Sequence, residues 1–184
     1  MTYEEICDKV AEIKSRYAES DPFRLIKDMG IVLIFRAMGK GDDAIKGFFL
    51  ECNRIKMITI NSDLPVAIQR IIAAHEVGHA VLHYSSEVQA FHEVGLFDES
   101  TIMEKDANLF AAEYLMNDED VFSVLNADYT FFGAAAALRV PVELLDFKFR
   151  IMKWRGFKLS APIEARSNFL RDLEVPFNAD NHVC

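Results

Sequence analysis

The sequence predicts an α+β domain in which a small, mostly antiparallel sheet packs on a set of longer helices. Short β-branched and aromatic runs cluster in the first 62 residues, and apolar residues recur at helical spacing from Pro65 onward. The chain has 184 residues, 51% of them hydrophobic, which suffices for one core. No repeat, low-complexity segment or linker interrupts it. We therefore expect residues 1–184 to form a single domain.

The first third of the chain combines two helices with the strands. Residues 3–18 carry apolar side chains three and four positions apart, which predicts an amphipathic helix. Ser20 or Asp21 caps a second helix, with Pro22 in its first turn, and Gly30 suits its end. Three strands are expected, over residues 31–36, 45–52 and 55–61, the last two joined by a tight turn at Asn53-Arg54.

Longer helices account for most of the remaining sequence. Asn117 or Asp118 is expected to cap the helix that opens the C-terminal helical part, and Val140-Pro141 divides that part again. The expected segments are a helix over 65–84, a loop over 85–99, a helix over about 100–116, a helical part over 118–156, and a short strand or irregular tail over 157–184.

Composition and charge narrow the classes of function. No apolar run reaches the ~18 residues that span a membrane, and the acidic, amphipathic start is unlike a signal peptide. Cys7, Cys52 and Cys184 are far apart, which favours free thiols in a reducing cytoplasm. The net charge of −9 disfavours general binding to nucleic acids. We expect a cytoplasmic protein without a membrane partner.

The chemistry of the chain concentrates in "IIAAHEVGHAVLH", residues 71–83. His75 and His79 lie one helical turn apart and can offer two imidazole nitrogens to one metal ion. Glu76 lies ~100° around the helix from His75, where it can accept a proton from the attacking water. This H-E-x-x-H arrangement predicts a zinc hydrolase with His75 and His79 as ligands and Glu76 as catalytic base.

Small neighbours, including Gly78, allow another backbone to approach this helix, and the strand before it is expected to be an exposed sheet edge suited to a peptide substrate. The alternative is a buried helix whose histidines bond to backbone carbonyls.

His83 is expected to be structural or to support a ligand, because it lies ~12 Å along the helix from His75. A solvated position is expected for His92, the alternative being oxyanion stabilisation, and no role for His182.

A catalytic zinc needs three protein ligands, and no further histidine follows at a suitable distance. The third ligand is therefore expected to be a carboxylate from "MEKDANLFAAEYLM", residues 103–116: Glu104, Asp106 or Glu113. Glu104 and Asp106 are ~200° apart on a helix, so only one can face the metal. Helical geometry does not choose between them.

"HEVGHAVLH" followed by "EKDANLFAAEYLM" resembles the ImmA/IrrE metallopeptidases, and the likeness extends over roughly residues 20–120. The resemblance implies a zincin-like fold of the gluzincin type and a third ligand directly before "AN", which is Asp106 here, where the family has glutamate. We favour Asp106, with Glu104 as the alternative. It also implies a zinc endopeptidase that cleaves a helix-turn-helix repressor of a phage or mobile element.

Two other functions stay open. The chain could be a non-proteolytic, metal-binding regulator, although metal binding alone needs no base such as Glu76. Residues 133–156 could form a DNA-binding helix-turn-helix with a basic second helix carrying Lys148, Arg150, Lys153 and Arg155. The abundance of apolar residues in that helix, including Phe147 and Phe149, favours core packing instead.

Overall fold

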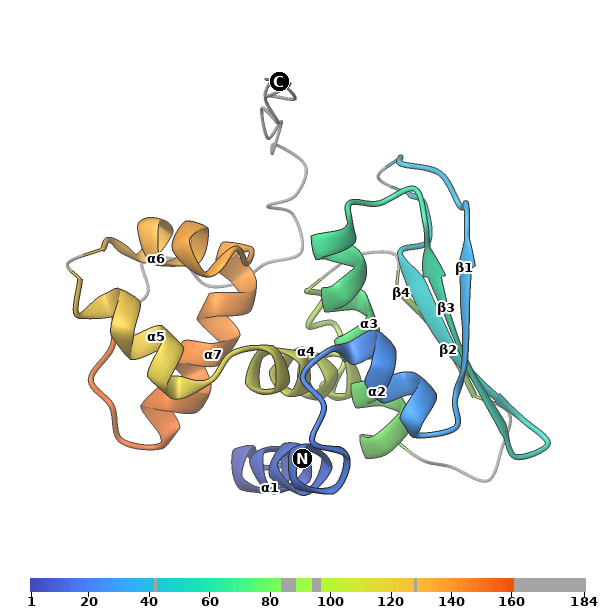
Figure 1. The fold of residues 1–184 in the computed structure, drawn as a ribbon, viewed down its shortest axis with the longest axis horizontal. Helices are drawn as coiled ribbons and strands as arrows, with labels where there is room; N and C mark the ends of the chain where they lie inside the picture. Colours follow the sequence, from blue (N-terminus) through green and yellow to red (C-terminus); the bar gives the residue numbers. More distant parts are fainter. Residues whose placement is uncertain (42, 84–88, 94–96, 128, 161–184) are drawn as a thin grey trace, which may run out of the picture.

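The computed structural model describes residues 1–41, 43–83, 89–93, 97–127 and 129–160, and for 89–93 the backbone only. Within these residues the chain forms seven helices and one four-stranded sheet (Figure 1). The predicted α+β class is confirmed.

The first two helices begin and end where local signals place them. Helix α1 covers Tyr3–Tyr17, and α2 covers Pro22–Asp28. The Asp21 carboxylate caps α2 by accepting a hydrogen bond from the Phe23 backbone N–H at 3.1 Å. Gly30 follows α2 with a φ of +71°, a left-handed conformation that glycine adopts without strain.

The strands form one mixed sheet in the order β1-β3-β2-β4. Strand β1 pairs with β3 in parallel, whereas β2 pairs antiparallel with both β3 and β4. The β2–β3 turn has positive φ at both Asn53 and Arg54, as a tight hairpin requires. The strands cover Val32–Arg36 (β1), Gly47–Cys52 (β2), Ile55–Asn61 (β3) and Gln89–Glu93 (β4).

Two expectations about this sheet are wrong. Part of the segment 85–99, expected to be a loop, is strand β4, whose backbone pairs with β2. Strand β3, expected at an exposed edge, lies between β1 and β2, so the described edge strands are β1 and β4. Sequence patterns do not show which strands pair, because the partners are distant in sequence. The five-residue strand β4 depends on its pairing with β2 more than on its own strand propensity.

Five helices complete the described fold. They are α3 (Val66–Leu82), α4 (Ile102–Leu115), α5 (Asp118–Leu125), α6 (Phe131–Leu138) and α7 (Val142–Trp154). Helix α3 packs against strands β2 and β3 and against α4, while α4 also contacts α1 and α7. Figure 1 shows α5, α6 and α7 on the far side of α4 from the sheet. Helix α3 is therefore enclosed between the sheet and α4.

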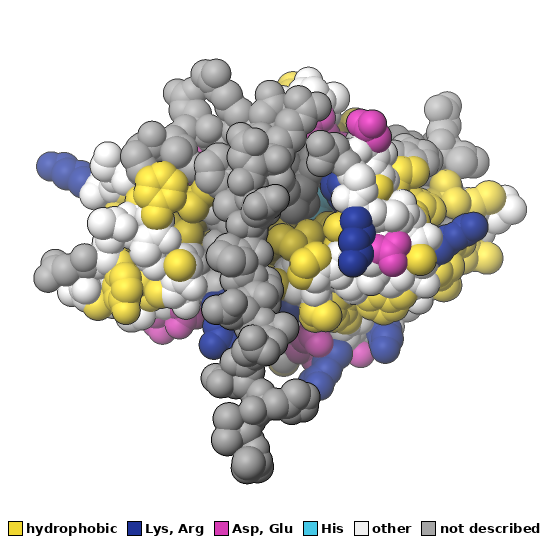
Figure 2. Space-filling model, turned by 90° about the horizontal axis from the view of Figure 1, so that it is seen from above, with side chains coloured by type: hydrophobic (Ala, Val, Ile, Leu, Met, Phe, Trp, Pro, Cys, Tyr) yellow, Lys and Arg dark blue, Asp and Glu magenta, His cyan; other side chains and the backbone are white. Residues whose placement is uncertain are grey.

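The surface of the described part carries some exposed apolar side chains. Val32, Ile34 and Phe35 of edge strand β1 are exposed, and hydrophobic side chains are visible on that flank in Figure 2. Among the described helices, none is long and apolar enough to cross a membrane. Residues 157–160 contain no strand, and the rest of the predicted tail lies outside the described residues.

Candidate metal centre

Helix α3 carries its polar residues in the centre of the fold. His75 and Glu76 are 0% exposed, and His79 is 1% exposed. Burying such groups is costly unless each is paired or bound to a metal. Their neighbours on α3 are small or apolar, so the helix packs closely on both sides.

Helices α3 and α4 approach each other closely at Gly78 and Ala107. A Cβ atom placed on Gly78 would lie 3.1 Å from the Ala107 Cα, so the two backbones are in direct contact here. Glu104 and Asn108, three residues before and one after Ala107, lie on this side of α4. Asp106 is ~200° around the helix from Glu104, so the two carboxylates cannot face the same point.

His75, His79 and Glu104 meet in one cluster. The Nε2 atoms of the two histidines are 2.9 Å apart, and Glu104 Oε2 lies 3.2 Å from that of His75 and 3.4 Å from that of His79. Ligands at ~2.0–2.1 Å in a tetrahedral zinc site are ~3.3 Å apart. The spacing of the three atoms therefore fits one zinc ion with a fourth position left for water or substrate.

Hydrogen bonds around His75 orient its Nε2 atom toward the cluster. Asn108 Nδ2 donates to the Asp98 carbonyl at 2.8 Å, so Asn108 Oδ1 faces His75 Nδ1 at 2.9 Å and accepts its proton. His75 Nε2 then carries a lone pair, as a metal ligand must. Glu104 Oε2 is buried and has no hydrogen-bond partner among the described residues. These acceptors are the kind of group that a cation would satisfy together.

The protonation states agree with this arrangement. Burial lowers the pKa of His79 from 6.5 to about 4, which keeps the imidazole neutral at pH 7. Burial alone would raise the pKa of the Glu104 carboxyl, but its contacts with His75 and His79 lower it below its usual range. A neutral imidazole and an ionised carboxylate are the forms that bind zinc.

Asp106, the residue preferred by the sequence analysis, lies outside the cluster. Its Oδ2 accepts a hydrogen bond from the Met1 amino group at 2.7 Å and lies 3.7 Å from His83 Nε2. His83 itself contacts His79, with 3.1 Å between their Nδ1 atoms. The geometry therefore favours Glu104, the alternative, because its carboxylate lies against both histidines, whereas that of Asp106 lies against Met1 and His83.

Glu76 lies where α3 meets the start of strand β2. A Cβ atom placed on Gly47 would be 3.3 Å from Glu76 Oε1 and 2.4 Å from Ile72 Cγ2. Only a glycine leaves room for both side chains at this point. The role of Gly47 was not visible in the sequence, because the contact joins two distant segments.

Comparison with known proteins agrees with the architecture. The sequence matches the IrrE N-terminal-like domain family (Peptidase_M78) over residues 26–150, a range that includes α3 and α4. The chain belongs to this peptidase family. It is also 32% identical over 139 residues to immunity region protein 2 of Bacillus phage phi105, a match that covers 76% of this chain and 85% of that protein. The resemblance noted in the sequence is confirmed.

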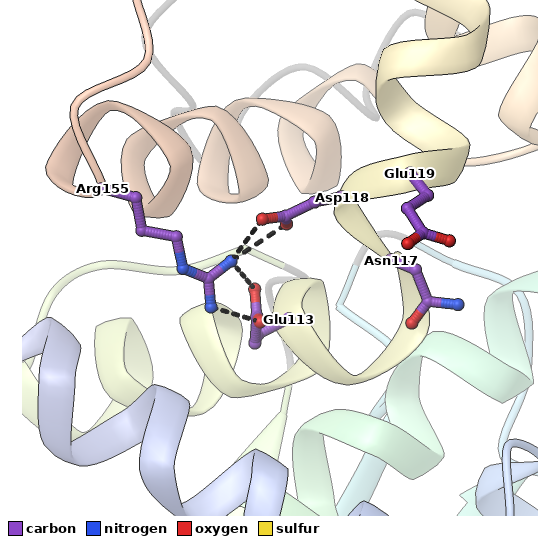
Figure 3. A pocket seen from close by; sticks show the side chains of 5 residues that line it. All are labelled: Glu113, Asn117, Asp118, Glu119 and Arg155. Carbon is purple, nitrogen blue, oxygen red and sulfur yellow. Dashed lines mark hydrogen bonds and ion pairs between the residues drawn. The ribbon is translucent and has the colours of Figure 1, made fainter.

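The other carboxylate candidate in this member of the IrrE-like family serves a different contact. Glu113 binds Lys148 Nζ at 2.7 Å and the Arg155 guanidinium at 2.7 Å, joining α4 to α7. Figure 3 shows Arg155 facing the carboxylates of Glu113 and Asp118 at an open pocket. Arg155 is thereby held between two acidic side chains, outside the cluster of His75, His79 and Glu104.

Ion pairs of α7 also argue against DNA binding by residues 133–156. Lys148 is fully buried between Glu113 and Asp118, and Arg150 pairs with Asp146 at 2.8 Å. Basic groups that bind phosphates must be exposed. The His92 side chain and all of His182 lie outside the described residues of this IrrE-like domain.

Proposed function

We propose that this IrrE-like domain is a zinc-dependent endopeptidase in which His75, His79 and Glu104 bind the metal and Glu76 is the catalytic base. The observation that carries the proposal is the convergence of three buried acceptor atoms within 4.8 Å of one another. Membership of a peptidase family supports it. Zinc, when bound, supplies a Lewis acid that makes water nucleophilic at neutral pH and polarises a peptide carbonyl.

The residues of the chain contribute positioning and proton transfer. Asn108 holds His75 with Nε2 toward the cluster, and the packing of α4 on α3 places Glu104 against both histidines. Glu76, next to His75, accepts the proton of the attacking water and returns it to the leaving amine. Because these groups are buried, their positions are set by packing before a substrate arrives.

The proposed substrate is a helix-turn-helix repressor or a similar regulatory protein of a phage or mobile element. The relative from phage phi105 is named for an immunity region, which supports a regulatory substrate. Strand β4, at the described sheet edge, pairs with β2 next to Gly47, where Glu76 lies. An extended peptide could add to such an edge by backbone hydrogen bonds. A repressor substrate implies a cytoplasmic location.

The test combines metal content with cleavage of helix-turn-helix repressors from the same genome. Wild-type protein should bind about one zinc ion per chain and cleave the repressor, with loss of cleavage after chelation and recovery with zinc. Glu76→Gln should bind zinc equally well but not cleave. A wild-type chain that binds no zinc, or a Glu76→Gln variant with full activity, would contradict the proposal.

The second candidate is a metal-binding regulator without peptidase activity, which the same cluster also supports. It predicts one zinc ion per chain, no cleavage product, and identical repression phenotypes for wild type and Glu76→Gln. The burial of Glu76 beside a metal ligand favours the peptidase, because a sensor has no use for a base at this position.

A further inference from the structure

His79 has a partner of an unusual kind for a metal-binding histidine. Its Nδ1 lies 3.1 Å from His83 Nδ1, one helical turn further along α3. The His83 side chain is only 6% exposed, and its backbone N–H is bonded to the His79 carbonyl at 3.2 Å. Two imidazoles so close and so well held must share one hydrogen bond, with one nitrogen as donor and the other as acceptor.

We propose that His83 is a positioning residue that accepts the Nδ1 proton of His79 and so directs the Nε2 lone pair of His79 to the metal. This inference rests on the proposed zinc site. Histidine ligands of metals usually donate their second N–H to a carbonyl, carboxylate or water. His75 follows that rule through Asn108, whereas His79 uses the neutral ring of His83.

Asp106 explains why the shared proton belongs to His79. A neutral His83 that accepts at Nδ1 carries its own proton on Nε2. That nitrogen lies 3.7 Å from Asp106 Oδ2, and a carboxylate stabilises a nearby N–H. The opposite tautomer would direct a lone pair at the Asp106 carboxylate and place the His79 proton on Nε2, in the cluster. The chain Asp106–His83–His79 therefore sets the ligand form of His79.

Asp106, which its motif position suggested as a ligand, thus acts on the metal through His83 and His79. Loss of an outer hydrogen-bond partner of this type typically lowers metal affinity 10–100-fold. The effect on catalysis follows through the metal, because the converging acceptor atoms belong to His75, His79 and Glu104.

A matched pair of variants tests the acceptor alone. Asparagine and leucine have almost the same size and shape, but only asparagine offers an oxygen near the position of His83 Nδ1. We expect His83→Leu to bind zinc 10–100-fold more weakly than wild type. His83→Asn should bind at least tenfold more tightly than His83→Leu. The measurement is competition for Zn²⁺ against a chromogenic chelator, with thermal unfolding of the chelator-treated proteins as the check on folding.

Equal affinities for the two variants, whether both strong or both weak, would overturn the inference, because the acceptor would then have no effect. If only one variant folds, the test is to compare the visible spectrum of its cobalt-substituted form with that of cobalt-substituted wild type. A perturbed visible spectrum for His83→Leu, or an unchanged one for His83→Asn, supports the role, and the reverse overturns it. Failure of the zinc site itself is seen separately, as wild-type protein that does not bind zinc.

Discussion

Gly47 gives the sharpest structural test of how the sheet supports the site. A Cβ atom at this position would lie 2.4 Å from Ile72 Cγ2, well inside van der Waals contact, and 3.1 Å from the Thr59 carbonyl oxygen. Ile72 is 0% exposed and cannot swing into solvent. Gly47→Ala must therefore displace β2 or force Ile72 from its rotamer, which costs about 1–3 kcal/mol.

The assay is unfolding of the metal-free protein, since bound zinc would obscure the packing effect. For a chain of this size, about 1–3 kcal/mol corresponds to a fall in Tm of about 2–12 °C. Leucine has no methyl group on Cβ, so Ile72→Leu should relieve part of the clash. The double variant should then be less destabilised than the sum of the two single variants. Cleavage activity should fall as well, because Glu76 Oε1 is only 3.3 Å from the new methyl group.

Gly41 provides the matched control. A Cβ atom there meets nothing within 4 Å, so Gly41→Ala should be neutral or stabilise by up to about 1 kcal/mol. Equal stability of Gly47→Ala and Gly41→Ala, or additive effects in the Ile72→Leu cycle, would refute the packing argument.

Four further predictions concern the site and its support. Glu104→Gln should abolish tight zinc binding, whereas Asp106→Asn should retain one zinc ion per chain at about three- to tenfold lower affinity; the reverse ranking in a metal analysis would restore Asp106 as ligand. Asn108→Leu should weaken zinc binding 10–100-fold through His75, and unchanged affinity in a chelator competition would contradict that role. Lys148→Met leaves the half-buried carboxylates of Glu113 and Asp118 with Arg155 as their remaining partner, and should lower the free energy of unfolding in urea by about 1–3 kcal/mol without changing zinc affinity. In metal-free protein, the lowered pKa of His79 should reduce stability by about 3 kcal/mol as pH falls from 6.5 to 4; stability that is flat over this range would show that His79 is not buried as a neutral ring.

Local signals in the sequence were sufficient where one segment determines its own structure. The ends of α2 follow from Asp21 and Gly30, and the hairpin turn follows from Asn53-Arg54, because capping and turn chemistry act within a few residues. The H-E-x-x-H spacing likewise brought His75 and His79 together, since both lie on one helix. Strand β4 was missed because its hydrogen bonds come from β2, about 40 residues earlier in the sequence.

The choice between Glu104 and Asp106 was beyond local signals, because it depends on the rotation of α4 about its own axis. That rotation depends on how α4 packs against α3, α1 and α7, and the close approach of Gly78 to Ala107 is part of that packing. Glu104 and Asn108 lie four residues apart on one side of α4, and Asp106 lies on another. Glu104 then reaches both histidines while Asn108 orients one of them. The packing of α4 on α3 thus supplies both the third acceptor of the cluster, from Glu104, and the orientation of His75, through Asn108.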